Sequence, residues 1–186
     1  AFAIPILLSG AIHLDGFLDS CDALFATVPV NRRLEIFKDP HHGTFALAGL
    51  AILTVWMAAA LSAIDAAHLA AVLAFSGATA RLAGVSNALF VPYARLDATP
   101  VLSQRPPFVP LAIEAIVLLL AGWLTAGLIG IALVPGAIVT SIGAGALLKR
   151  RLGGGLVGDV YGFLIVSLEA ALLTVVAAGE WMAVHA

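Results

Sequence analysis

The chain has 186 residues, of which 62% are hydrophobic and only 11% charged, and its net charge is −2. A soluble domain of this length needs more polar surface to cover its core, whereas lipid accepts apolar side chains that face outwards. The composition therefore excludes an ordinary soluble domain. We expect an all-α, polytopic membrane helix bundle, built as one domain over residues 1–186, whose surroundings are the lipid bilayer and which has no nucleic-acid partner.

The apolar stretches indicate about six transmembrane helices. The first, residues 2–12, is too short for a complete span, and it opens without Met or a basic leader, so we expect an N-terminal segment to be missing. Five further stretches approach the span length of about 20 residues: 44–64, 69–91, 111–130, 131–148 and 160–178. The division between Gly127 and Pro135 is soft, because Gly130 and Pro135 fit either a tight turn or a kinked helical hairpin.

Basic residues predict the orientation of these spans. Eight of the nine fall in alternate loops, which face one side of the membrane under this span count: Arg32, Arg33, Lys38, Arg95, Arg105, Lys149, Arg150 and Arg151. That side should be the cytoplasmic one, and the single cysteine, Cys21, fits a reducing compartment there. The ninth, Arg81, lies inside a span, where an arginine normally faces a polar cavity or a partner.

The acidic residues are concentrated in one short stretch of this apolar chain. Five of the eleven lie between His13 and Gly43: Asp15, Asp19, Asp22, Glu35 and Asp39. On a helix, Asp15, Asp19 and Asp22 share one stripe, and like charges so placed are destabilising unless a cation holds them. Hard oxygen ligands at a membrane surface suit Mg²⁺, so we predict a divalent metal site. The alternative is a polar helix face or a set of helix-capping acids.

Two neighbouring features leave alternatives open. His13 falls on the opposite side of the same helix from Asp15, where it is either a general base or an interfacial histidine bonded to backbone. Asn31 can cap a short helix that runs towards Asp39, on which Glu35 can form a surface ion pair with Arg32 or Lys38.

Two connecting segments on the same face can also reach ligands. Of the adjacent His41 and His42, at most one is expected to contact metal or phosphate, because adjacent turn residues point apart. The glycine-rich turn at 153–159 can expose backbone N–H groups to phosphate before a helix, or can be only a helix C-cap and turn. The topology brings this turn, the acidic stretch and the 93–110 loop to one face.

Three segments together resemble the cobalamin synthase family, the adenosylcobinamide-GDP ribazoletransferases. They are HLDGFLDSCDALF at 13–25, RRLEIFKDPHHGTFA at 32–46 and GGGLVGDVYG at 153–162. Arg81 and the PYAR run at 92–95 also resemble family positions. The chain departs from the family pattern at Ala23, where Gly is common, and at Val157, where Thr is usual.

The resemblance implies a Mg²⁺-dependent transfer in the assembly of vitamin B12. In that reaction α-ribazole, or its 5'-phosphate, attacks the cobinamide-linked phosphorus of adenosylcobinamide-GDP and releases GMP. We assign Asp15, Asp19 and Asp22 as metal ligands, with Asp39 and Asp159 as further candidates. The catalytic set comprises His13 as the first candidate for the base, a carboxylate of the acidic stretch such as Asp15 as the second, and three residues that hold phosphates: Lys38, Arg81 and Arg95.

Two other functions compete with this interpretation. A CDP-alcohol phosphotransferase would use similar aspartates, but its Asp-Gly-x-x-Ala-Arg pattern is not in this sequence. A cation transporter predicts ionisable residues at mid-membrane depth in several spans, yet the acids here gather at one surface, and only Arg81, Glu114 and Glu169 lie in or near spans. A purely structural subunit gives no account of the acidic stretch.

Overall fold

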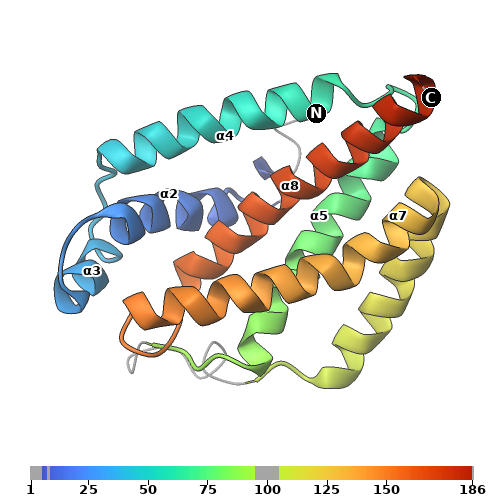
Figure 1. The fold of residues 1–186 in the computed structure, drawn as a ribbon. Coiled ribbons are helices and arrows are strands. Elements are labelled where there is room, and N and C mark those ends of the chain that lie inside the picture. The colour runs from blue at the N-terminus through green and yellow to red at the C-terminus, as the bar shows by residue number, and fades with distance from the viewer. Residues whose placement is uncertain (1–5, 8, 95–104, 186) are drawn as a thin grey trace.

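The computed structural model describes residues 6–7, 9–94 and 105–185, and it consists of helices joined by short connections (Figure 1). In chain order these are α2 (Ile12–Phe25), α3 (Val30–Ile36), α4 (Thr44–Ser62), α5 (Leu69–Ser86), the 3-10 turn η1 (Asn87–Leu89), α7 (Phe108–Arg151) and α8 (Gly158–His185).

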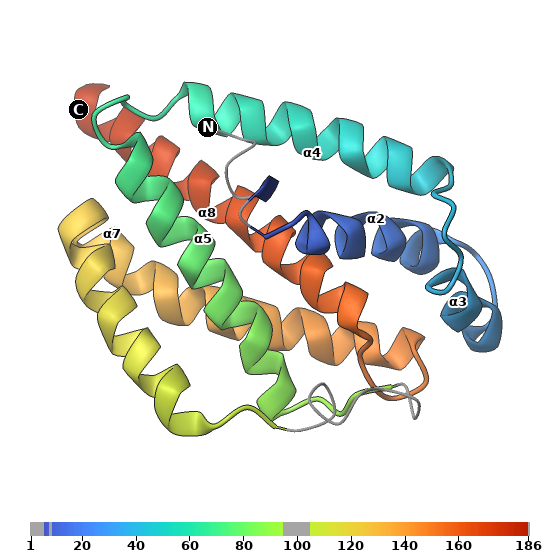
Figure 2. The same cartoon turned by 180° about the vertical axis from the view of Figure 1, so that it is seen from behind.

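Helix α8 runs through the middle of the bundle and packs against α2, α4, α5 and α7 (Figures 1 and 2). Of the most apolar stretch of each helix, 61% is buried in α8 and 56% in α5, against 22% in α4 and 17% in α7. Helices α5 and α8 are therefore the inner pair, while α4 and α7 present exposed apolar side chains such as Ile52, Val55 and Leu124. Exposed apolar faces on long helices suit lipid.

Within the described residues, four helices are long and apolar enough to cross a membrane, so the expected membrane helix bundle is confirmed and the count of about six is only approximate. Two of the expected spans lie within α7. Its backbone is non-helical at Ala126 and Gly127, where it folds back into two arms (Figure 1). A Cβ on Gly130 would collide with the backbone of Gly122, so glycines at both positions let the arms touch. The reversal occurs at Gly127, whose φ of +57° favours glycine, and not at residue 130.

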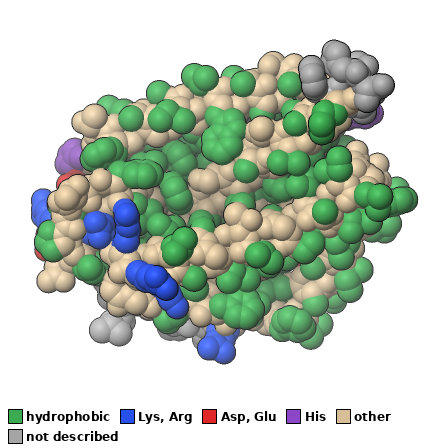
Figure 3. Space-filling view, in the orientation of Figure 1, with side chains coloured by type: hydrophobic (Ala, Val, Ile, Leu, Met, Phe, Trp, Pro, Cys, Tyr) green, Lys and Arg blue, Asp and Glu red, His purple; other side chains and the backbone are tan. Residues whose placement is uncertain are grey.

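The two ends of the bundle differ in polarity. The connections around α3, after α5 and between α7 and α8 lie at one end, and the basic side chains visible in Figure 3 gather at that end. The α4–α5 connection and the reversal of α7 lie at the other (Figure 1). The segregation of bases into alternate connections is thus a feature of the fold as well as of the sequence.

One expected helix boundary is wrong. Helix α3 begins at Val30, and Pro29 is the N-cap residue, so Asn31 lies inside the helix and does not cap it. Proline suits this place because its φ is fixed near the observed −65°. The surface ion pair expected beside it is confirmed, with 2.7 Å between Arg32 Nη1 and Glu35 Oε2.

Candidate functional site

The site is built where α2 crosses α8. A Cβ on Gly16 would lie 2.7 Å from the carbonyl oxygen of Asp159, and one on Gly162 would lie 2.8 Å from that of His13. Any side chain at either position would push the two backbones apart, so the glycines of both sequence motifs permit the close approach. The crossing brings the first turns of α2 beside the first turn of α8, where Asp159 lies.

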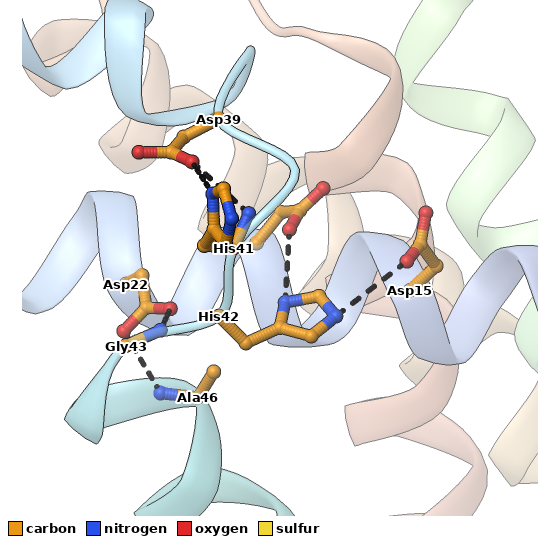
Figure 4. Close-up of polar contacts among 8 residues, drawn as sticks. Asp15, Asp22, Asp39, His41, His42, Gly43 and Ala46 are labelled. Carbon is orange, nitrogen blue, oxygen red and sulfur yellow. Dashed lines mark hydrogen bonds and ion pairs between the residues drawn. The ribbon is translucent and has the colours of Figure 1, made fainter.

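Asp15, Asp19 and His42 form a compact group at this crossing (Figure 4). Each offers one ligand atom, and these atoms all lie within 4.8 Å of one another. His42, from the connection before α4, sits between the acids, with its Nδ1 3.4 Å from Asp19 Oδ1 and its Nε2 3.9 Å from Asp15 Oδ1. Two carboxylates and an imidazole at this spacing can share one divalent cation.

Asp19 is the acid most affected by this environment. Its side chain is 18% exposed, against 66% for that of Asp15. Burial, followed by repulsion from Asp15 and Asp159, raises the pKa of Asp19 to about 6. Burial and the neighbouring negative charges both disfavour the ionised carboxylate, and a bound cation would offset both effects.

Asp22 and Asp39, the other predicted ligands near this group, have other partners in the structure. The carboxylate of Asp22 accepts hydrogen bonds from the backbone N–H groups of Gly43 (2.5 Å) and Ala46 (3.0 Å), and so caps the start of α4 (Figure 4). Asp39 is exposed and bonds to the backbone and ring of His41 at 3.0 and 2.9 Å. The hydrogen bond from the His41 side chain is the main reason that the pKa of Asp39 is lowered.

A small cavity of about 30 Å³ is lined by His13 of α2, Arg81 of α5 and Glu169 of α8. Arg81 donates to the carbonyl of Gly77 at 2.7 Å, and its Nη1 is 3.4 Å from Glu169 Oε2. The Nδ1 of His13 is buried and has no hydrogen-bond partner among the described residues. Burial, and then the charge of Arg81, lower the pKa of His13, so its ring is neutral near pH 7.

The glycine-rich turn closes the same end of the bundle. Gly153 and Gly154 have positive φ, and Gly154 N donates to Lys149 O at 2.9 Å, which is a C-cap arrangement. Leu156 pairs with the segment after η1, accepting from Ala94 N at 2.8 Å and donating to Pro92 O at 2.9 Å. The 93–110 loop therefore meets the turn at its described start.

The predicted phosphate-holding residues are spread around the site. Lys38 is exposed, in the turn after α3, and Arg81 is inside the bundle. Arg95 lies outside the described residues. The sequence alone does not show whether His41 or His42 faces inwards, because adjacent residues in a turn point in different directions. A histidine that directly precedes Gly43 and α4 is a weak signal, and the group of three emerges only from the fold.

Comparison with known proteins identifies the family. The model of the family described as cobalamin-5-phosphate synthase matches residues 1–177. The chain belongs to the cobalamin-5-phosphate synthase family. Two curated relatives, both named adenosylcobinamide-GDP ribazoletransferase, come from Deinococcus radiodurans and Pseudomonas syringae pv. syringae. The first is 37% identical over 172 residues, or 89% of this chain, and the second 34% identical over 179 residues, or 92% of it.

The chain spans 58% of the length of the Deinococcus relative and 71% of that of the Pseudomonas relative. A third relative, from Lachnoclostridium phytofermentans and with the same name, is 56% identical over 45 residues, or 24% of this chain and 17% of its own length. No solved structure matches the chain. Membership of the cobalamin-5-phosphate synthase family thus comes from sequence, and the site geometry described here is independent of it.

Proposed function

We propose that this protein transfers α-ribazole, or its 5'-phosphate, onto the cobinamide-linked phosphate of adenosylcobinamide-GDP and releases GMP. The observation that carries the proposal is the group of Asp15, Asp19 and His42 at a helix crossing of a membrane bundle, in a chain of the cobalamin-5-phosphate synthase family. Cleaving a diphosphate requires positive charge on its non-bridging oxygens and on the departing phosphate. A cation between Asp15 and Asp19 would meet that need.

The residues present fit Mg²⁺, because Asp15 and Asp19 offer carboxylate oxygens and leave room for phosphate oxygens and water. When bound, Mg²⁺ would supply positive charge beside the diphosphate. His42 would orient the two acids, and Asp159 completes the negative surroundings of Asp19. Asp22 and Asp39 stay predicted ligands, although their capping and His41 contacts make them weaker candidates.

His13 is the proposed general base. The attacking ribose hydroxyl loses its proton as its oxygen bonds to the cobinamide-linked phosphorus, and the bond from that phosphorus to GMP breaks. A neutral imidazole can accept this proton, and the lowered pKa of His13 supports a neutral ring near pH 7. Burial is the main cause of this lowered pKa and the charge of Arg81, which is paired with Glu169, adds to it, while Lys38, Arg81 and Arg95 remain proposed phosphate contacts.

The segregated basic loops support an inner-membrane location with the site facing the cytoplasm, where nucleotide substrates are made. The test is to reconstitute the purified protein in nanodiscs with adenosylcobinamide-GDP, α-ribazole and Mg²⁺, and to follow GMP by chromatography. Stoichiometric GMP and cobalamin are expected, with loss of both on chelation of the metal.

Asp19→Asn should lower the rate roughly 100-fold at limiting Mg²⁺, whereas the matched Glu35→Gln control, on the exposed α3 ion pair, should not. The proposal would be refuted if the folded, reconstituted protein released no GMP, or if it released CMP from CDP-diacylglycerol and an alcohol.

A further inference from the structure

A second, much larger cavity lies beside the acid group. Its volume is about 700 Å³, which is within the range of small-molecule sites. It is formed between the start of α2, the end of α5 with η1, the segment before α7 and the first turns of α8. Nothing in the roles assigned so far to metal ligands or base accounts for a space of this size.

The cavity reaches the neighbourhood of the acid group through Asp159. His13 and Asp159 both line it, and Asp159 also interacts electrostatically with Asp19. Through Asp159, one end of a molecule held in the cavity would lie on the side of the acid group, near Asp19. A substrate of the transfer that occupies this space would thus have one end at the reacting phosphorus.

The cavity wall is mostly apolar and includes two aromatic rings. Ile12, Val85 and Ile165 contribute aliphatic surface, while Tyr93 and Tyr161 contribute the rings. Tyr93 has a fixed position, because its hydroxyl accepts a hydrogen bond from Gly158 N at 3.2 Å and its backbone pairs with Leu156. Such a wall suits a flat aromatic group with a hydrocarbon edge, since a polar edge buried there would lose its hydrogen bonds.

Among the described residues that line the cavity, two are charged, Arg105 and Asp159. Arg105, which is exposed, lines the side nearest α7, and Asp159 and His13 line the side nearest the acids. An occupant with an aromatic body, a ribose and an anionic phosphate matches this division, because guanidinium groups bind phosphate well. Guanine presents a polar edge that the aliphatic wall cannot satisfy.

We propose that this cavity binds the acceptor, an aryl riboside or its 5'-phosphate, with the Tyr161 ring against the aromatic base and Arg105 at the phosphate. This inference rests on the proposed function, since that function supplies the acceptor. It assigns Tyr161 and Arg105 as substrate-binding residues. Tyr161 determines affinity for the base, and Arg105 determines preference for the phosphorylated form.

The test is equilibrium binding of α-ribazole and α-ribazole 5'-phosphate to the purified protein in nanodiscs, without donor. Tyr161→Leu should weaken both ligands roughly tenfold, whereas Tyr161→Phe, which keeps the ring, should change neither by more than about twofold. Arg105→Gln should weaken only the phosphorylated ligand, by about fivefold. Ala88→Trp, which fills the cavity from η1, should abolish binding of both.

Unfolding of each variant is checked through the accessibility of Cys21 to a thiol reagent, because this lone cysteine is buried. Unchanged affinity in folded Tyr161→Leu and Ala88→Trp would overturn the inference, as would displacement of α-ribazole by GMP. Binding that follows the predicted pattern without any GMP release would leave the cavity assignment standing and remove the proposed reaction. Normal turnover and normal acceptor KM in the cavity variants would remove the cavity assignment and leave the proposed reaction standing.

Discussion

Replacing Asp19 by Asn should stabilise the metal-free protein while abolishing its response to Mg²⁺. The pKa of Asp19 rises from 3.8 to about 6, chiefly through burial and repulsion from Asp15 and Asp159. A rise of roughly two units corresponds to about 3 kcal/mol of lost stability once the group is ionised, as an upper limit. Because the folded-state pKa is raised, this stability is present below pH 4 and is lost as the pH increases through 6.

The assay is thermal unfolding in detergent, read by a fluorogenic thiol reagent at the buried Cys21. In a chelator, the Tm of the parent protein should fall between pH 4.5 and 7, and that of Asp19→Asn should fall less, so that the variant is higher by about 5 to 10 °C at pH 7.5. Mg²⁺ should raise the Tm of the parent protein again, by an amount that grows as Asp19 ionises, and should not change the Tm of Asp19→Asn. Glu35→Gln, an equal change of charge on exposed α3, is the matched control.

The reasoning is refuted if metal-free Asp19→Asn is no more stable than the parent at pH 7.5, or if both gain equally from Mg²⁺. The first result would mean that the acids at the crossing do not repel one another. The second would place the responsive cation elsewhere in the protein.

Three further predictions use the same unfolding assay. Gly16→Ala should destabilise by about 1–3 kcal/mol and reduce GMP release, because its Cβ meets the Asp159 backbone; equal stability and activity would mean that the helices do not touch there. Glu169→Gln should destabilise by about 2–3 kcal/mol by leaving Arg81 without its charge partner, whereas Glu114→Gln on the exposed face of α7 should not, and equal effects would contradict the ion pair. Asp22→Ala should lose a helix cap worth about 1 kcal/mol but should still be stabilised by Mg²⁺. Asp39→Ala should lose no cap and should also still be stabilised by Mg²⁺. If Mg²⁺ no longer stabilised one of these variants, the residue replaced in it would be assigned to the metal site.

Hydropathy and periodicity predicted much of the fold because they depend on local sequence. The spans α4 and α5 and the reversal within α7 lie within a few residues of the expected ranges, Asp15 and Asp19 do lie on a helix, and α8 continues to His185, beyond its expected end at 178. The sequence predicts the reversal between Gly127 and Pro135 but does not show whether Gly130 or Gly127 turns the chain. Only the fold shows that one permits contact between the arms and the other adopts a positive φ.

The site was less predictable because its contacts join distant parts of the chain. The i, i+4, i+7 spacing put Asp22 on the same stripe as Asp15 and Asp19, but it could not show that the start of α4 would take up its carboxylate. Arg33 reads as one more basic loop residue, yet it is buried and donates to carbonyls of Ala23, Ala26 and Arg151. Its charge therefore helps to close the end of α2.

The most direct test of the metal site is Mn²⁺ binding, measured by the loss of the electron paramagnetic resonance signal of free Mn²⁺ as purified protein is added. The parent protein should bind Mn²⁺, and Mg²⁺ should displace it. The Asp15→Asn, Asp19→Asn double variant, shown to be folded through the protection of Cys21, should bind none at this site. Undiminished Mn²⁺ binding by the folded double variant would contradict the assignment of the α2 carboxylates as the cation site.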